Sequence, residues 1–163
     1  MTIIQKLKQL RCGLITWSTH SLALPVIRIL LKPNKFPYSV SDLRDLPDGS
    51  VGKRMLAFLE HHQLHLLPDY ESHDIKHTIL SYPANEEGEA SLQYFFLGNG
   101  QRSFPVLITV LVSYFVMPEY HRSFKKAYNR GRCTPPLVGT NWFALMPLPY
   151  ESVINQLKIP DNE

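Results

Sequence analysis

The fold is decided by residues 72–98, SHDIKHTILSYPANEEGEASLQYFFLG, which contain two predicted helices separated by a break. Pro83 ends the first helix, because its ring removes a backbone donor and clashes with the preceding turn. Asn85 is a good N-cap for the second helix, and the two glutamates after it favour the positive end of the helix dipole. Gly98 and Gly100 then mark the end of this second helix.

Four residues of this segment are candidate metal ligands: His73, Asp74, His77 and Glu89. Residues four apart lie on one face of a helix and neighbours differ by about 100°, so His73 and His77 can converge on one ion while Asp74 leans in from the flank. Glu89 would arrive on the second helix, from the opposite side. Two imidazoles and two carboxylates suit a divalent metal ion, with zinc expected, and leave coordination positions open for a substrate.

The same residues have an alternative interpretation. Histidines on helices are usually surface residues, and Asp74 could pair with Lys76 or favour the first turn of its helix. A second histidine group, His61, His62 and His65, also contains an i, i+4 pair, but no carboxylate with a suitable spacing follows it. A histidine near a helix C-terminus is favoured by the dipole, so we expect this second group at most at the rim of the site.

Other segments follow the same rules. Ser50 is a good N-cap for a helix to about His62, and Asp69 or Ser72 could cap the helix that carries HDIKH. The further expected elements are one or two helices with a basic flank over Ile3–Leu31, a loop over Lys32–Asp48, a helix from Ser103 and Pro105 to about Tyr114 that restarts at Pro118 and ends at Gly131, a loop over Thr134–Pro149, and a last helix over Tyr150–Leu157. By propensity alone, Val106–Met117 could equally be a buried strand.

HDxxH, followed by a glutamate twelve residues past the second histidine, resembles the signature of the coenzyme Q (ubiquinone) biosynthesis protein 4 family. The resemblance covers about residues 40 to 160. It includes Leu46–Gly52, Phe58–Leu59, Gly88–Ala90, Tyr128–Arg132, Pro136–Leu137, Trp142 and Leu157–Ile159. Two departures stand out: this chain has Ser81 where the family usually has a glycine soon after the second histidine, and it is shorter than typical members.

The resemblance implies a mainly α fold, a single-domain helical bundle with a loop-rich C-terminal segment, and favours a helix for Val106–Met117. It implies that His73, Asp74, His77 and Glu89 are the metal ligands. It also implies ubiquinone biosynthesis, through metal-dependent decarboxylation at C1 of a prenylated hydroxybenzoate-type precursor by a carbon–carbon lyase. The alternative is a non-catalytic protein that binds prenyl lipid or organises other quinone-biosynthesis proteins.

A prenylated substrate requires an apolar groove for its tail. The candidate residues for this groove are Phe95, Phe96, Phe104, Leu107 and Leu111. The alternative is that these side chains belong to the core, as apolar helical residues usually do. The sequence does not identify the acid that returns a proton to the ring, and Lys76 is expected to form salt bridges on the surface.

Composition predicts one domain over residues 1–163, since the chain is long enough for one core and 44% of it is hydrophobic. The net charge of +3 is low, and the chain lacks zinc-finger spacing, an aromatic–basic RNA motif and a phosphate loop, so nucleic-acid binding is not expected. Cys12 and Cys133 cannot make a disulfide scaffold, and free thiols in a reducing compartment are expected. A homodimer is compatible with the sequence.

Membrane association is expected to be peripheral. Leu14–Leu31 is interrupted by His20, Pro25 and Arg28, and Val106–Met117 is shorter than the ~20 residues that a spanning helix needs. Residues 1–31 combine apolar and basic side chains, so they could face a membrane surface. An ordinary packing helix is the favoured alternative for this region, because its apolar residues do not form a single stripe. We therefore expect a cytoplasmic protein on the inner face of the membrane.

Overall fold

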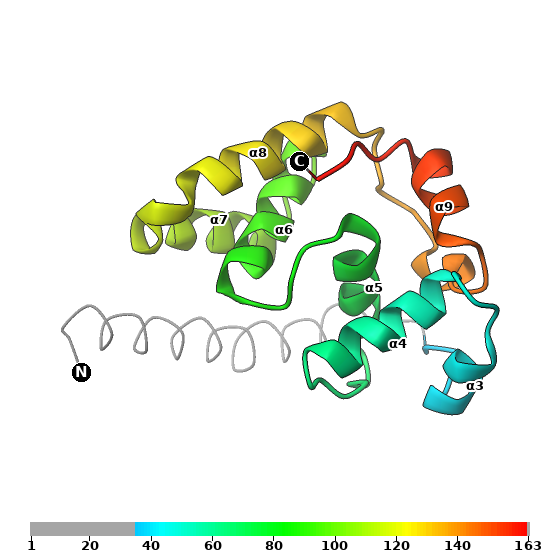
Figure 1. Cartoon of the computed structure of the whole chain (residues 1–163). Coiled ribbons are helices and arrows are strands. Elements are labelled where there is room, and N and C mark those ends of the chain that lie inside the picture. The colour runs from blue at the N-terminus through cyan, green and yellow to red at the C-terminus, as the bar shows by residue number, and fades with distance from the viewer. Residues whose placement is uncertain (1–34, 163) are drawn as a thin grey trace. The chain divides into compact units, whose positions relative to one another are not determined.

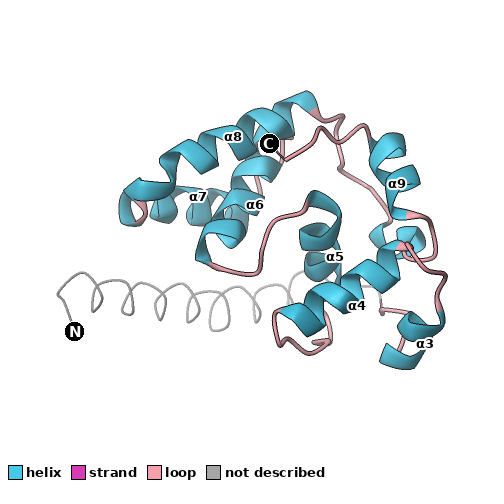
Figure 2. Cartoon of the chain, viewed as in Figure 1, coloured by secondary structure: helices cyan, strands magenta, loops and turns pink. Residues whose placement is uncertain are grey.

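Helices joined by short loops make up the computed structural model, which describes residues 35–162 (Figures 1 and 2). This part of the chain contains seven α-helices, two short 3₁₀ helices and no strand beyond an isolated bridge between Ser50 and Pro149. The predicted mainly α fold is therefore confirmed. The helices expected over Ile3–Leu31 lie outside the described residues, and the prediction of one domain over the whole chain stays a prediction.

The elements follow one another in the order α3 (Val40–Asp45), α4 (Val51–His61), α5 (Glu71–Leu80), α6 (Glu86–Gly98), α7 (Phe104–Val116), η2 (Pro118–Tyr120), α8 (His121–Cys133), η3 (Trp142–Leu145) and α9 (Tyr150–Leu157). From Phe36 onward they form one compact unit. Figure 1 shows α6, α7 and α8 together on one side of this unit, with α3, α4 and α9 on the other side. The segment that could have been a strand is helix α7.

Two predicted caps are confirmed. The Ser50 hydroxyl accepts a hydrogen bond from the backbone N–H of Lys53, and the Asn85 side chain accepts one from that of Gly88. The predicted cap of α5 is wrong, because Tyr70 occupies the N-cap position and makes no side-chain capping bond. Asp69, one of the two predicted caps, instead adopts a left-handed conformation with φ 71°.

Two segments that were predicted to be loops contain short helices. α3 interrupts the loop expected over Lys32–Asp48, because Ser39 and Asp42 form a reciprocal capping box. The loop expected over Thr134–Pro149 contains η3, which begins after Asn141. In both cases a polar side chain satisfies backbone donors at the start of one helical turn.

The core lies around α6. Its fully buried side chains come from α3, α4, α5, α6, α8 and α9 and from the segments between helices, and they include Met55, Ile75, Leu92, Phe95, Met146 and Val153. Asn99 at the end of α6 is buried with every side-chain group bonded. Its Nδ2 donates to the carbonyls of Gly131, Thr134 and Pro135, and its Oδ1 accepts from the N–H of Leu137. The C-terminal loop is therefore attached to α6.

Two glycines let α6 and α8 lie in backbone contact. A Cβ atom on Gly131 would overlap the carbonyl oxygen of Phe95, and one on Gly98 would overlap that of Tyr128. Gly131 was predicted to end α8, but the helix continues to Cys133. This prediction is wrong because the glycine serves the close approach of two helices rather than a left-handed cap.

We expect Gly131→Ala to destabilise the protein by about 1–3 kcal/mol, because the added methyl group forces the α6–α8 contact apart. Asn129→Ala is the control, since Asn129 is exposed on α8 and such changes usually stay within about 0.5 kcal/mol. Urea denaturation of both variants measures the difference. Equal free energies of unfolding for Gly131→Ala and the unmodified protein would contradict the close-contact interpretation.

Candidate metal centre

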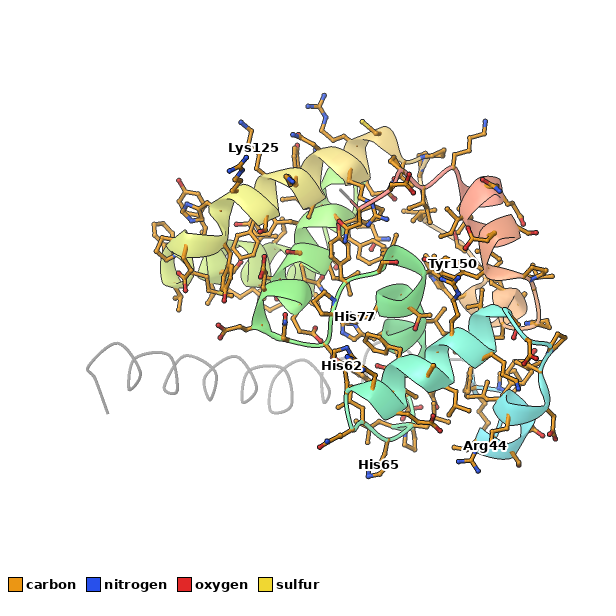
Figure 3. The ribbon with its side chains drawn as sticks, in the orientation of Figure 1. Arg44, His62, His65, His77, Lys125 and Tyr150 are labelled. Atoms are coloured by element: carbon orange, nitrogen blue, oxygen red, sulfur yellow. The ribbon has the colours of Figure 1, made fainter. Side chains whose placement is uncertain are left out.

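Three of the four predicted ligands meet between α5 and α6. His73 Nε2 lies 3.0 Å from Glu89 Oε2, His77 Nε2 lies 3.1 Å from Glu89 Oε1, and the two Nε2 atoms are 3.0 Å apart. All three ligand atoms lie within 4.8 Å of one another. Figure 3 labels His77 on α5, where its side chain is almost fully buried. Two histidines and a glutamate are a zinc donor set that leaves a position for water or substrate.

A backbone carbonyl fixes the orientation of His77. Its Nδ1 lies 3.0 Å from the carbonyl oxygen of Tyr82, and only the nitrogen can be the donor in this pair. The neutral ring therefore carries its hydrogen on Nδ1 and directs the Nε2 lone pair at the site. Such an outer hydrogen bond to a carbonyl is typical of histidines that bind metals. Tyr82 could not be predicted as part of the site from its residue type, because only its backbone carbonyl takes part.

The turn after α5 delivers that carbonyl. Ser81 ends the helix in a left-handed conformation with φ 56°, the backbone region for which glycine is usually chosen. The Ser81 hydroxyl lies 3.0 Å from that of Tyr150 on α9, and the Tyr150 hydroxyl also donates to the carbonyl of Ile79. Arg130 on α8 donates to the carbonyl of Leu80. Side chains from α8 and α9 thus hold the end of α5.

Glu89 is placed by the start of α6. A Cβ atom on Gly88 would overlap the carbonyl of Pro83, so glycine allows the preceding loop to lie against the first turn of α6. The Asn85 cap bonds the N–H of the same glycine at 2.8 Å. This arrangement puts Glu89 in the first turn, where the positive end of the helix dipole favours its carboxylate.

Mutual hydrogen bonding sets the charges of the three ligands. Burial alone would lower the pKa of His77, but the hydrogen bond and charge of Glu89 outweigh it and hold that pKa above its usual value. Burial lowers the pKa of His73 despite the same partner. The two histidines hold the pKa of Glu89 well below its usual range, against the effect of burial. Glu89 therefore favours the charged form of the His77 imidazole, whereas burial favours the neutral form of His73.

Asp74 is buried next to the triad but is not one of the three residues whose ligand atoms cluster. Burial is the main reason that its pKa rises to about 7, and the charge of His77 opposes this rise. Tyr70 covers the same end of α5, with its ring centroid 4.5 Å from that of His73. Burial raises the pKa of Tyr70 as well. A role for Asp74 as a fourth ligand stays a prediction.

Lys76 does not form the predicted surface salt bridge. Its ammonium group lies 5.4 Å from the ring centroid of Phe96 and 5.8 Å from that of Trp142, and it has no ion pair within residues 35–162. Burial lowers the pKa of this lysine. The prediction is wrong because the Lys76 side chain packs against Trp142 of η3. Trp142 is distant in sequence, so this contact could not be inferred from the neighbours of Lys76.

The second histidine group makes no metal cluster in the described part of the chain. His61 and His65 are exposed, and Figure 3 shows His65 pointing away from the helices. The His62 ring lies 4.7 Å from that of Phe58, and the Phe58 ring stacks on His77 at 5.8 Å. Phe58 therefore contacts both rings and forms an apolar wall on the side of the site where His62 lies.

The five residues predicted for a tail groove lie in two different environments. Phe95 and Phe96 are fully buried in the core on α6. Phe104, Leu107 and Leu111 lie on α7 and are exposed. The structure does not bring the five side chains together. No single helix among residues 35–162 is long and apolar enough to cross a membrane; α7 and Pro118–Cys133 pass such a test only as a pair, bent by 104°.

The fold is similar to that of a solved protein. The crystal structure of a proposed ubiquinone biosynthesis protein from Nostoc punctiforme superposes with a TM-score of 0.60, at 22% sequence identity, over 84% of this chain and 76% of that one. No protein-family profile matches the sequence. No curated protein matches it either. The similarity at this identity establishes a shared fold.

We expect His77→Ala to weaken zinc binding more than about 100-fold, because even substitutions outside the ligand shell cost 10–100-fold. His65→Ala is the matched control, since this histidine is exposed and remote from the triad. Competition titration against a chromogenic zinc chelator measures both affinities. Equal losses in the two variants, or none, would show that the triad does not hold the ion.

The pH dependence has a defined sign. In the metal-free protein the pKa of His77 is higher in the folded state than in the unfolded chain, where it is about 6.5. Protonated His77 therefore stabilises the fold at pH values below about 6.5, and this stability is lost as the pH rises through the folded pKa. Zinc must displace the same proton, so its binding strengthens over the same range. The rise in Tm on adding zinc should be larger at pH 8 than at pH 6, by differential scanning fluorimetry. A rise that is larger at pH 6 would contradict this linkage.

Proposed function

We propose that this chain is a metal-dependent enzyme of ubiquinone biosynthesis that removes the C1 carboxyl group of a prenylated hydroxybenzoate-type precursor. The observation that carries the proposal is the three-residue set of His73, His77 and Glu89. Closed structural zinc sites have four protein ligands, whereas catalytic sites keep a position for water or substrate. The fold shared with a proposed ubiquinone biosynthesis protein supports the choice of pathway.

The chain's residues divide the work between holding and protecting the site. His73, His77 and Glu89 would hold a divalent ion, and when bound this ion supplies positive charge for a substrate carboxylate and for the negative charge that develops on the ring. The Tyr82 carbonyl keeps the His77 lone pair directed at the site. Phe58, stacked on His77, excludes water from one side.

Decarboxylation also requires a proton. The bond from ring carbon C1 to the carboxyl carbon breaks, its electron pair stays on C1, carbon dioxide leaves, and a proton takes its place. Asp74 is a suitable donor, because a general acid works best when its pKa lies near the operating pH, and burial raises this pKa to about 7. This role is the alternative to its being a fourth ligand.

Asp74→Asn distinguishes these two roles. If Asp74 donates the proton, the variant should keep the zinc affinity of the unmodified protein and lose more than about 100-fold in turnover. The measurements are zinc titration and release of labelled carbon dioxide from a carboxyl-labelled prenyl-4-hydroxybenzoate in detergent. Loss of zinc with Asp74→Asn would assign the residue to the ligand set.

His77→Ala and His65→Ala serve as negative and positive controls for this assay. Tight binding of both zinc and the prenylated acid, without release of carbon dioxide, would reject the enzyme and favour a non-catalytic protein that binds prenyl lipid.

A further inference from the structure

Helix α7 is apolar along its whole length and largely exposed. Its thirteen residues, FPVLITVLVSYFV, contain no charged side chain. Phe104 is 73% exposed and Phe115 72%, and six more of its large apolar side chains are at least 41% exposed. Soluble monomers rarely expose a continuous apolar surface of this kind, which usually marks a site of interaction.

Only a narrow stripe of α7 is covered by the described residues. Val106 and Ser113 are buried, and the Val110 carbonyl accepts a hydrogen bond from the hydroxyl of Tyr94 on α6. This stripe attaches α7 to α6 and leaves the remainder of the helix surface exposed. The exposed surface therefore surrounds most of the helix.

Positive charge is concentrated on either side of α7, and most of it lies on α8. Residues 102–133 contain six lysines and arginines and one acidic residue, a net charge of +5. The other described residues contain six lysines and arginines and twelve acidic residues, a net charge of −6. Arg102 and Arg122, both exposed, lie just before and just after the apolar stretch.

We propose that α7 docks on a lipid bilayer that contains anionic lipid, with its apolar side chains at the boundary between headgroups and acyl chains. Basic residues flanking an exposed apolar helix match this surface in both chemistry and charge. Thirteen helical residues are about 20 Å long, less than the ~30 Å of the hydrocarbon layer, so the helix lies in the interface rather than across it. The bend of 104° between α7 and the segment that follows is compatible with this placement.

Charge disfavours the two alternative partners for the exposed face of α7, which are a second copy of the chain and residues 1–34. A second copy of the chain would bring one +5 segment against another. Residues 1–34 carry five lysines and arginines and no acidic residue, so they too would meet like charge at the α7–α8 segment. An anionic membrane is the occupant whose charge is opposite.

One hydrogen bond links the end of the α7 segment to the helix that carries Glu89. The Tyr120 hydroxyl, at the corner between α7 and α8, donates to Glu86 Oε1 at 3.4 Å. Glu86 lies in the first turn of α6, the turn that carries Glu89. The docking itself does not depend on metal binding or on catalysis.

The test is flotation of the full chain with vesicles of phosphatidylcholine alone or with phosphatidylglycerol, at low and high salt. We expect the unmodified protein to bind the anionic vesicles. The affinity should fall at least tenfold for Leu111→Asp/Phe115→Asp, and about fivefold for each of Arg122→Gln and Lys125→Gln, because each removes one basic residue. Val138→Asp is the matched control, since Val138 is 71% exposed in a loop away from α7. It should bind like the unmodified protein.

Three results would overturn the proposal. The first is no binding to anionic vesicles at low salt. The second is binding that Leu111→Asp/Phe115→Asp leaves unchanged while Lys6→Glu/Lys8→Glu abolishes it, which would place attachment at the N-terminus. The third is an oligomer by light scattering that the α7 variants dissociate, without vesicle binding. Far-ultraviolet circular dichroism and zinc titration of each variant verify that the fold is intact, and Phe104→Ser provides a milder change on the same face.

Discussion

The hydrogen bond between His77 Nδ1 and the carbonyl of Tyr82 links the path of the backbone to the chemistry of the site. It selects the ring tautomer, aims Nε2 at Glu89 and requires the chain to turn back at Ser81. The left-handed conformation of that serine is therefore a condition for the metal centre rather than an incidental feature of a helix end. A residue with a branched Cβ would adopt this conformation at a higher cost.

Local signals in the sequence predicted most of the helices and three members of the candidate site. Ser50 and Asn85 form their caps with backbone groups three residues away, so their roles can be read from neighbours. The i, i+4 spacing of His73 and His77 places both on one face in the same way. The approach of Glu89 was inferred from the break at Pro83, and the structure gives the reason in Gly88, which lets that loop lie close.

The errors share one physical cause, which is dependence on residues distant in the sequence. Gly131 is a residue type typical of helix ends, but here glycine is required because the backbone of Phe95 on another helix lies against it. Lysine is typical of the surface, but the ammonium group of Lys76 lies over the rings of Trp142 and Phe96. The exposure of α7 is the converse case, because a stretch that is apolar enough for a core contributes only a narrow stripe to it. Sequence periodicity reports what a segment can bury, and the fold decides what it does bury.

The far end of α5 is held by side chains from the last part of the chain. Tyr150 and Arg130 bond to the carbonyls of Ile79 and Leu80, in the helical turn that carries His77. The packing of α8 and α9 against this turn orders His77, so the free energy of binding an ion is coupled to that packing. By reciprocity, whatever tightens this packing also raises the affinity for the ion, so the C-terminal helices act as a remote determinant of metal binding.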